Sequence, residues 1–450
     1  MEELVIENGV LQRCVGSAAC IRVPDGVREI REKAFLFCEH LERVELPAQL
    51  RCIGDDAFSF CPNLRSAQLP EGLESIGARA FFGSALETIT IPKSVRRIGE
   101  RFVNSCSALR EIRVAPGNPC FQCRDGLLLD RSGETLVCCP GGWTGECRLP
   151  SEVRTIASAA FEGCAGVRSI TLPAGLQTIE DRAFEGCSAL EEMVIPSSVQ
   201  ALGNFAFSSC WSLRSITLPE GVQCLGEGCF WRCVELQEMH LPASLREIRR
   251  IAFTGCAALR EFTVAPESPF YHTEDGMLLD TRQKRLLCCP GGRTESCRLS
   301  EETECVAEEA FFSSRCPRVV LPRRLAEFDE NLLTKLPPGV LIAPWLGLDE
   351  VQLFLNRYRA MLNFCRAQEE GFVCTAADTY RDYARTHVSE FYDLLLEEKS
   401  VLRWFLRERL LGRGDAKALL MRTDLEGRTL LLEYLHEVFP PCGAGDGDEV

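Results

Sequence analysis

The fold is decided by one stretch of sequence, Ile179-Glu-Asp-Arg-Ala-Phe-Glu-Gly-Cys-Ser-Ala-Leu-Glu-Glu-Met-Val-Ile-Pro196. Written as a pattern, it reads I-x-x-x-A-F-x-x-C-x-x-L-x-x-Φ-x-Φ-P, in which Φ is an apolar residue. Wherever nothing is inserted, its phenylalanine recurs every 23 residues, at Phe35, Phe58, Phe81, Phe161, Phe184, Phe207, Phe230 and Phe253. One shorter unit has Val103 in this position, a further copy has Phe311, and a degenerate copy covers residues 325–344. A fixed period of this length indicates a solenoid, because units too small to bury their own apolar face must stack on one another.

Each unit contains one predicted strand and one predicted turn. In Leu213-Arg-Ser-Ile-Thr-Leu-Pro219 the apolar residues alternate, as in a half-buried strand, and the proline ends it because it has no amide hydrogen to donate. The Ala-Phe-x-x-Cys segment is expected to form either a tight turn or a single helical turn. Its phenylalanine is expected to fill the interior once per coil.

These units resemble the BspA-like leucine-rich repeats, whose consensus is close to L-x-x-I-x-[IL]-P-x-x-[VL]-x-x-I-G-x-x-A-F-x-x-C. Residues 24–344 carry the resemblance, and Ile53-Gly-Asp-Asp-Ala-Phe-Ser-Phe-Cys-Pro-Asn-Leu64 follows the consensus without a gap. The resemblance implies an α/β repeat fold, a curved right-handed solenoid with parallel strands on its concave face. It also implies an interaction protein, often a bacterial surface protein, with no catalytic residues to carry over.

Composition and charge narrow the possible functions. The net charge of −15 argues against binding to nucleic acid or to anionic membranes, both of which need clustered Lys and Arg. The first nine residues contain neither the basic nor the apolar region of a signal peptide, and no run of 18 apolar residues predicts a membrane span. These features favour the cytoplasm. The surface proteins of the family favour the alternative, a cell-surface or secreted location.

The 26 cysteines are numerous enough to suggest disulfides. Many of them, however, occupy one position of the repeat, just after the phenylalanine: Cys38, Cys61, Cys106, Cys164, Cys187, Cys210, Cys233 and Cys256. A position filled once per coil favours packing, in which a reduced cysteine acts as a small buried apolar residue. Disulfides between some of the cysteines remain the alternative.

The domain organisation is predicted from interruptions of the repeat. Residues 1–23, with the turn signal Asn8-Gly9, are expected to form an N-terminal capping hairpin for a solenoid over residues 24–344. Two insertions, 114–142 and 264–292, match each other 150 residues apart, and each is expected to be a β-hairpin. Residues 345–440 have helical spacing and predict an α-helical C-terminal domain, followed by a disordered acidic tail at 441–450.

The first insertion contains a weak metal-site candidate formed by Cys120, Cys123, Cys138 and Cys139. Zinc prefers four thiolate or imidazole ligands. The second insertion has Phe270 and Thr273 where the first has Cys120 and Cys123, although it keeps the Cys-Cys pair. This difference favours packing, so no metal, cofactor or catalytic residue is predicted. A zinc- or thiol-dependent activity in the hairpins stays open as an alternative.

The predicted binding surface is the concave face of the solenoid. One outward-pointing row comprises Glu45, Gln68, Thr90, Arg113, Thr171, Val194, Thr217, His240, Thr263 and Val320. A flanking row comprises Arg43, Ser66, Thr88, Glu111, Ser169, Glu192, Ser215, Glu238, Glu261 and Arg318. The part between Thr171 and Thr263 is the strongest candidate because five uninterrupted coils carry it. The sequence therefore predicts a non-catalytic scaffold for an unidentified protein or peptide, with a surface or secreted adhesin of the same fold as the alternative.

Overall fold

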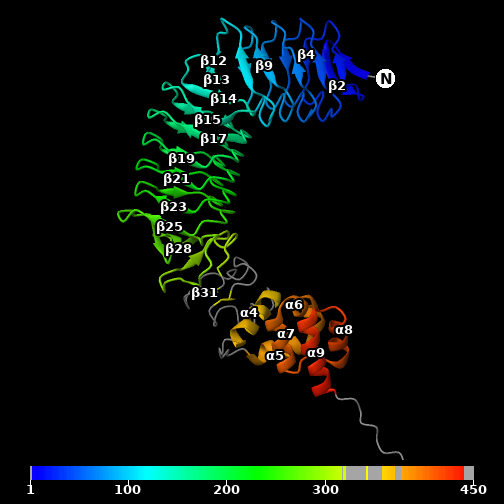
Figure 1. Ribbon diagram of the computed structural model, residues 1–450, viewed down its shortest axis with the longest axis vertical. Coiled ribbons are helices and arrows are strands. Elements are labelled where there is room, and N and C mark those ends of the chain that lie inside the picture. Colours follow the sequence, from blue (N-terminus) through cyan, green and yellow to red (C-terminus); the bar gives the residue numbers. More distant parts are fainter. Residues whose placement is uncertain (1–2, 317, 321–340, 343–356, 370–376, 440–450) are drawn as a thin grey trace, which may run out of the picture. The chain divides into compact units, whose positions relative to one another are not determined.

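The computed structural model describes residues 3–316, 318–320, 341–342, 357–369 and 377–439 (Figure 1). The chain divides into two compact units, which are described separately. The first comprises Met1–Leu278 with Pro290–Arg293, and the second comprises Leu279–Cys289 with Thr294–Val450. The predicted boundary at residue 344 and the predicted tail at 441–450 lie outside the described residues.

The first unit is a solenoid in which each coil contributes the predicted strand, here called a repeat strand. The repeat strands are β3 (Cys20–Arg22), β5 (Arg43–Glu45), β7 (Ser66–Ala67), β9 (Thr88–Ile91), β11 (Glu111–Val114), β15 (Thr144–Arg148), β17 (Gly166–Thr171), β19 (Glu192–Val194), β21 (Ser215–Thr217), β23 (Glu238–Leu241) and β25 (Glu261–Val264). Most neighbouring strands pair in parallel with a 23-residue offset, as Val194 does with Thr217, whereas β7 and β9, β17 and β19, and β21 and β23 lie in different sheets. Figure 1 shows the coils stacked in sequence order from blue to green.

Each coil also contains a second, two-residue strand that the repeat pattern does not predict, here called a return strand. The return strands of the first unit are β4 (Glu29–Ile30), β6 (Cys52–Ile53), β8 (Ser75–Ile76), β10 (Arg97–Ile98), β16 (Thr155–Ile156), β18 (Thr178–Ile179), β20 (Ala201–Leu202), β22 (Cys224–Leu225) and β24 (Glu247–Ile248). They pair in parallel, as β16 does with β18. Some coils approach so closely behind these strands that only glycine fits: a Cβ on Gly203 would lie 2.4 Å from the carbonyl carbon of Glu180.

The repeated phenylalanines form a stack inside the solenoid. Phe161, Phe184 and Phe207 are fully buried, and their successive rings stack with centroids 5.2 and 4.9 Å apart. The stack continues to Phe230 and Phe253, and an equivalent stack joins Phe35, Phe58 and Phe81. The predicted interior role of the phenylalanine is thus confirmed.

The repeated cysteines are buried, as predicted, except for the partly buried Cys38, and most of them also donate hydrogen bonds. The thiol of Cys210 donates to the carbonyl oxygen of Phe184 at 3.2 Å. The same oxygen accepts the amide hydrogen of Cys187 at 3.1 Å, so both of its lone pairs are used. Equivalent thiol bonds run from Cys61 to Phe35, Cys106 to Phe81, Cys187 to Phe161, Cys233 to Phe207 and Cys256 to Phe230. Each links one coil to the coil before it.

The Ala-Phe-x-x-Cys segment forms a tight turn, the first of the two expected alternatives. The turn contains two left-handed residues four positions apart, such as Arg182 (φ 59°) and Gly186 (φ 73°). The same pair recurs at 33/37, 56/60, 79/83, 101/105, 159/163, 205/209, 228/232 and 251/255. Glycine adopts this conformation at little cost, which accounts for its frequent use at the second position.

Antiparallel strands precede and interrupt the solenoid. The N-terminal pair β1 (Glu3–Glu7) and β2 (Val10–Val15) joins the return strands, because β2 pairs in parallel with β4. In the first insertion, β12 (Phe121–Arg124), β13 (Leu127–Asp130) and β14 (Thr135–Cys138) are antiparallel, and β14 then pairs in parallel with β16. The strands of the second insertion are β26 (Tyr271–Glu274), β27 (Met277–Asp280) and β28 (Arg285–Cys288).

The first insertion separates two repeat strands but leaves the turns of the solenoid stacked. Strand β11 pairs with β9, and β15 pairs with β17, whereas β11 and β15 belong to different sheets. The turns on either side of the insertion nevertheless meet: the Asn104 amide donates to the carbonyl of Ala159 at 2.6 Å, and Arg101 pairs with the buried Glu162. The return strands are interrupted as well, because β10 ends one sheet and β14 and β16 belong to another, so the described link across the insertion is made by the turns.

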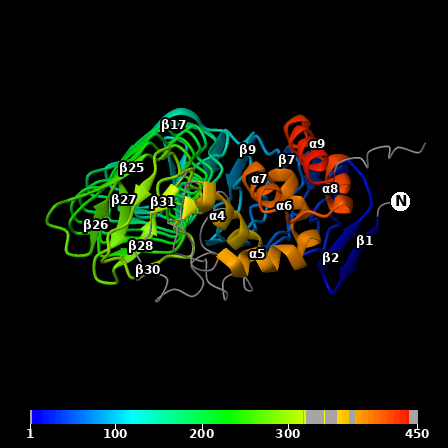
Figure 2. The same ribbon diagram turned by 90° about the horizontal axis from the view of Figure 1, so that it is seen from below.

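The second unit continues with short strands and then helices. Its strands beyond the second insertion are β29 (Cys297–Arg298), β30 (Cys305–Val306), β31 (Arg318–Val320) and β32 (Leu341–Ile342). Its helices are α4 (Arg357–Glu369), α5 (Ala377–Thr386), α6 (Tyr392–Glu397), α7 (Lys399–Arg407), α8 (Arg413–Leu420) and α9 (Leu425–Val438), with a 3-10 helix at Val388–Phe391. The helices gather into one bundle (Figure 2). Phe364 stacks on Tyr380 in its core, with ring centroids 4.4 Å apart. Within the described residues, no helix has both the length and the apolar character needed to cross a membrane.

Candidate functional site

The predicted binding residues lie on the outer side of the repeat strands, a surface here called the repeat-strand face. Side chains alternate along a strand, so the residue between two outward positions is buried, as Met193 is between Glu192 and Val194. The proposed residues are all exposed: Thr171, Glu192, Val194, Thr217, Glu238, His240 and Thr263. The equivalent positions Glu45, Gln68, Thr90 and Arg113 are exposed too, whereas the side chain of Val320 lies outside the described ones.

The structure brings these residues into a continuous row. Strand β23 pairs with β25, so His240 lies beside Thr263, and the imidazole Nδ1 is 2.8 Å from the threonine Oγ1. Strands that do not pair directly are still linked, because the Glu191 amide donates to the carbonyl of Arg168 at 3.2 Å. Val194 is the large apolar residue of this row, with 67% of its surface exposed. The row therefore offers a nearly uncharged centre flanked by glutamates.

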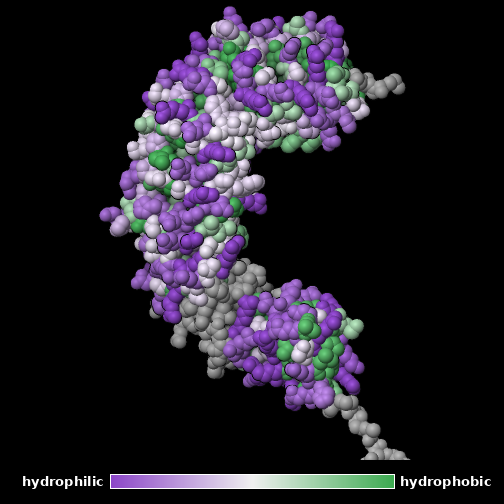
Figure 3. Space-filling view, viewed as in Figure 1, coloured by the Kyte–Doolittle hydropathy of each residue, from purple (hydrophilic) through white to green (hydrophobic). Residues whose placement is uncertain are grey.

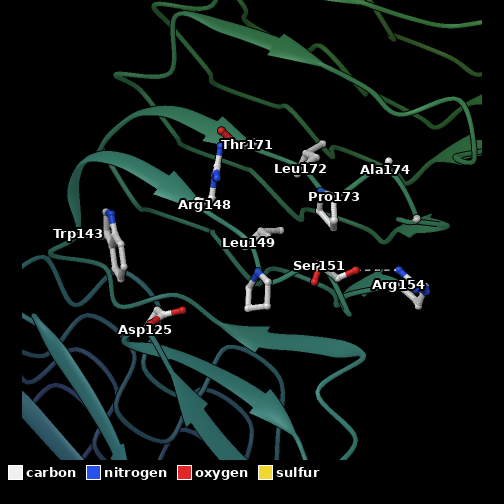
Figure 4. Close-up of a pocket in the computed structure, with 12 residues that line it drawn as sticks. Asp125, Trp143, Arg148, Leu149, Ser151, Arg154, Thr171, Leu172, Pro173 and Ala174 are labelled. Atoms are coloured by element: carbon white, nitrogen blue, oxygen red, sulfur yellow. Dashed lines mark hydrogen bonds between the residues drawn. The ribbon is translucent and has the colours of Figure 1, made fainter.

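A groove of about 740 Å³ lies at the end of this row, next to the first insertion (Figure 4). Thr171 and Arg148 line it from the repeat strands, and Trp143 and Asp125 line it from the insertion and the segment that follows. Figure 4 shows Trp143 and Asp125 at one end of the groove and Arg154 at the other. Of the proposed binding residues, only Thr171 lines it.

Trp143 also lines a second cavity, of about 950 Å³, together with Thr88, Arg110 and Glu111. The tryptophan therefore stands between two hollows where β11 and β15 fail to pair. Its indole nitrogen donates to the carbonyl of Glu146 at 3.1 Å, which fixes the ring. Its ring also packs against the hairpin turn, where a Cβ on Gly126 would lie 3.0 Å away.

Trp143 lies outside the 23-residue pattern, although the internal repeat contains a signal for it. The matching residue 150 positions later is Arg293, which forms an ion pair with Asp275 at 2.9 Å. The first insertion is thus followed by an aromatic residue at the position where the second is followed by an arginine in an ion pair. A half-buried tryptophan at the rim of two cavities is typical of residues that anchor a binding partner.

The four thiols of the weak zinc candidate are not brought together. Cys123 on β12 and Cys138 on β14 both lie opposite Leu128 of β13, so one whole strand separates them. Two strand spacings amount to about 9.6 Å, which is too wide for ligands of one zinc ion. Among the described residues, the group of three potential ligands that does converge is Cys289, Cys297 and Cys316.

Three buried thiols of the repeat are poor nucleophiles. Burial raises the pKa of Cys187, Cys210 and Cys233 well above the ordinary value of a thiol. Since the thiolate is the reactive form, these groups stay protonated and inert at neutral pH. In contrast, a hydrogen bond from Cys139 lowers the pKa of Cys147.

Several solved structures are similar to this chain. One solved structure, a leucine-rich repeat protein from Eubacterium ventriosum ATCC 27560, is 24% identical over 58% of this chain and 81% of the other, with a TM-score of 0.50. A leucine-rich cell surface protein from Faecalibacterium prausnitzii A2-165 is 29% identical over 54% and 71%, with a TM-score of 0.49. The pneumococcal vaccine antigen PcpA is 19% identical over 70% and 76%, with a TM-score of 0.47.

A comparison with curated proteins finds no match. The family model described as the BspA-type leucine-rich repeat region, with six copies, matches residues 5–118 and 144–260. These two ranges cover just over half of the chain and contain the phenylalanine stacks, the return strands of the first unit and all of its repeat strands except β25. The chain therefore belongs to the family of BspA-type leucine-rich-repeat proteins.

Proposed function

We propose that this protein is a non-catalytic scaffold that binds a protein or peptide along the repeat-strand face from β17 to β25. The observation that carries the proposal is the unbroken exposed row from Thr171 to Thr263, which ends in the groove beside Trp143. Solenoids commonly use such extended rows to bind other proteins. The row supplies contact area, and the groove supplies a recess for one larger side chain of the partner.

The chemistry of the face favours a polypeptide partner. Threonine and serine hydroxyls along the row can donate and accept hydrogen bonds, as a peptide backbone requires. Arg168, Arg214, Glu191 and Glu192 surround a further depression of about 590 Å³, so charges of both signs are available beside the row. On the side of the first unit that Figure 3 shows, hydrophobic residues are scattered among hydrophilic ones. The partner would therefore be held by polar contacts around a few apolar ones.

The proposal is tested by photo-crosslinking from single positions in the native host. A photoreactive amino acid replaces Thr171 or Thr217 on the repeat-strand face. The matched control replaces Thr178, an exposed threonine on the return strand β18. We expect one discrete crosslinked protein from both Thr171 and Thr217 and none from Thr178.

A competition step links the crosslink to the face itself. Excess unlabelled wild-type protein should abolish the crosslink, whereas unlabelled Val194→Asp protein should compete at least tenfold less well. Crosslinks of equal strength from Thr178, or equal competition by both proteins, would show that the repeat-strand face is not the binding surface.

A further inference from the structure

The second unit contains a buried cluster of three cysteines that comes from three separate segments. Cys289 directly follows β28, Cys297 lies on β29, and Cys316 lies two residues before β31. Their sulfur atoms all lie within 4.8 Å of one another, and the sulfurs of Cys297 and Cys316 are 3.2 Å apart. All three residues are at most 2% exposed. The pairing of β29 with β31 holds two of these segments side by side.

Polar groups around the cluster orient its side chains. The Ser314 hydroxyl oxygen lies 3.2 Å from the sulfur of Cys289 and accepts the amide hydrogen of Cys316 at 3.1 Å. The carbonyl oxygen of Glu295 lies 3.1 Å from the sulfur of Cys316. Such partners of the ligating side chains fix ligand geometry in metal sites.

A matching cysteine cluster lies at the end of the first insertion, but it is built differently. Cys139 and Cys147 correspond to Cys289 and Cys297, and the third thiol there is Cys164. Cys164 occupies the usual position of the repeat, and its sulfur lies 3.7 Å from the carbonyl oxygens of Cys139 and Pro140. In the second block that position is Ser314, and the thiol has moved two residues along the chain to Cys316. Within the described residues, only the second cluster brings three sulfurs within mutual reach.

We propose that Cys289, Cys297 and Cys316 together bind one thiophilic metal ion with a filled d shell, Zn(II) or Cu(I). Thiolates select these ions over hard cations such as Mg(II) and Ca(II). The two ions differ in the number of ligands. Cu(I) is satisfied by three thiolates, whereas Zn(II) takes a fourth ligand, for which the candidate is the Ser314 hydroxyl, 3.2 Å from the Cys289 sulfur. The bound ion would tie the end of the second insertion to two strands of the last described coils. This site is independent of the proposed function of the repeat-strand face.

Metal titration of the full-length protein tests the proposal. Protein purified without oxygen and stripped with a chelator is titrated with Co(II), whose sulfur-to-metal charge-transfer absorption reports thiolate ligands. Zn(II) then displaces Co(II), and Cu(I) is titrated separately against a chromogenic chelator. We expect one ion per chain in the wild type, at least a hundredfold weaker binding in Cys297→Ser and Cys316→Ser, and unchanged binding in the matched control Cys147→Ser.

Two further measurements keep the result decisive if a cysteine variant folds poorly. Ligation must displace the thiol protons, so wild-type protein should release up to about three protons per ion at neutral pH. Ser314→Ala should weaken Zn(II) binding and leave Cu(I) binding unchanged if Zn(II) uses the hydroxyl. Binding that is lost equally in Cys147→Ser, binding without proton release, or a Cys297–Cys316 disulfide in the anaerobic protein would overturn the proposal.

Discussion

A single residue per coil, the repeated phenylalanine, forms the ring stacks inside the first unit. Phe207 has a stacked ring on each side, with centroids 4.9 Å from Phe184 and 5.6 Å from Phe230. Val103, in the equivalent position of the shorter unit, is buried as well but lacks this stack. Aromatic pairs add stabilisation beyond the area that they bury. Phe207 should therefore contribute more than Val103 to the free energy of unfolding.

We expect Phe207→Ala to lower the free energy of unfolding by about 3–5 kcal/mol, because it removes a large buried side chain and leaves a cavity between two rings. Val103→Ala should lower it less, since a smaller side chain is removed and no ring stack is broken. Chemical denaturation of both variants measures the difference. Equal denaturation midpoints for the two variants would contradict the role given to the phenylalanine stack.

At the scale of the coil, side-chain bonds across the turns add to the backbone ladders. Asp56 accepts two hydrogen bonds from Arg79, 23 residues later, at 2.8 and 2.6 Å. The aspartate is 6% exposed. Hydrogen bonding to the Arg79 guanidinium holds the pKa of the Asp56 carboxyl below its usual value. The pair thus ties two neighbouring coils on the turn side of the solenoid.

This pair predicts an acid-sensitive contribution to stability. A carboxyl whose pKa is lowered by folding stabilises the protein above its unfolded pKa, about 3.9, and loses this effect as the pH falls through the folded value. Asp56→Asn should therefore cost about 1 kcal/mol at pH 7 and progressively less below pH 4. Urea denaturation of both proteins at pH 7, 5 and 3 measures this. A difference that stays constant across the three pH values would rule out the ion pair as its cause.

At the scale of the whole molecule, folding decides which cysteine thiols a reagent can reach. Within the described residues no disulfide joins two cysteines. Burial raises the pKa of the Cys210 and Cys256 thiols, while Cys20 and Cys123 are exposed. Folding therefore sorts the thiols into those that a reagent can reach and those that it cannot.

Alkylation followed by mass measurement should reveal this sorting. Native protein treated briefly at pH 7 should be modified at Cys20 and Cys123 but not at Cys187, Cys210, Cys233 or Cys256. The same protein, denatured without a reductant, should be modified at all 26 cysteines. Pairs that stay unmodified after denaturation would identify disulfides and disprove the interpretation of the repeat cysteines as reduced packing residues.

The sequence was sufficient to predict the features that repeat with one residue type per coil. The 23-residue spacing of Phe184 and Phe207 predicts the stack, and the alternation around Ile216 predicts the repeat strands. The return strands escape prediction because two residues, such as Thr178 and Ile179, contain too short an alternation to distinguish from a loop. The pairs of left-handed residues in the turns are not predicted for a different reason. The first position of each pair is occupied by residues as different as Arg182 and Ile251, so no residue type identifies it.

The sites are less visible in the sequence because they depend on contacts between distant segments. The position of Trp143 depends on the folded insertion, because its ring packs against Gly126 in the hairpin turn. The weak zinc candidate relies on closeness in sequence, and the strand β13 intervenes between its thiols. In contrast, Cys289, Cys297 and Cys316 are spaced irregularly and converge only through the pairing of β29 with β31.

The parallel stacking of the coils also has a mechanical consequence. Backbone hydrogen bonds between coils run along the stacking direction, so a force applied along the stack loads successive coil boundaries in series. Each failure between β17 and β25 would release 23 residues, or about 80 Å of extended chain. Under tension this part of the protein would lengthen in equal steps. Each step would correspond to one 23-residue repeat of the sequence.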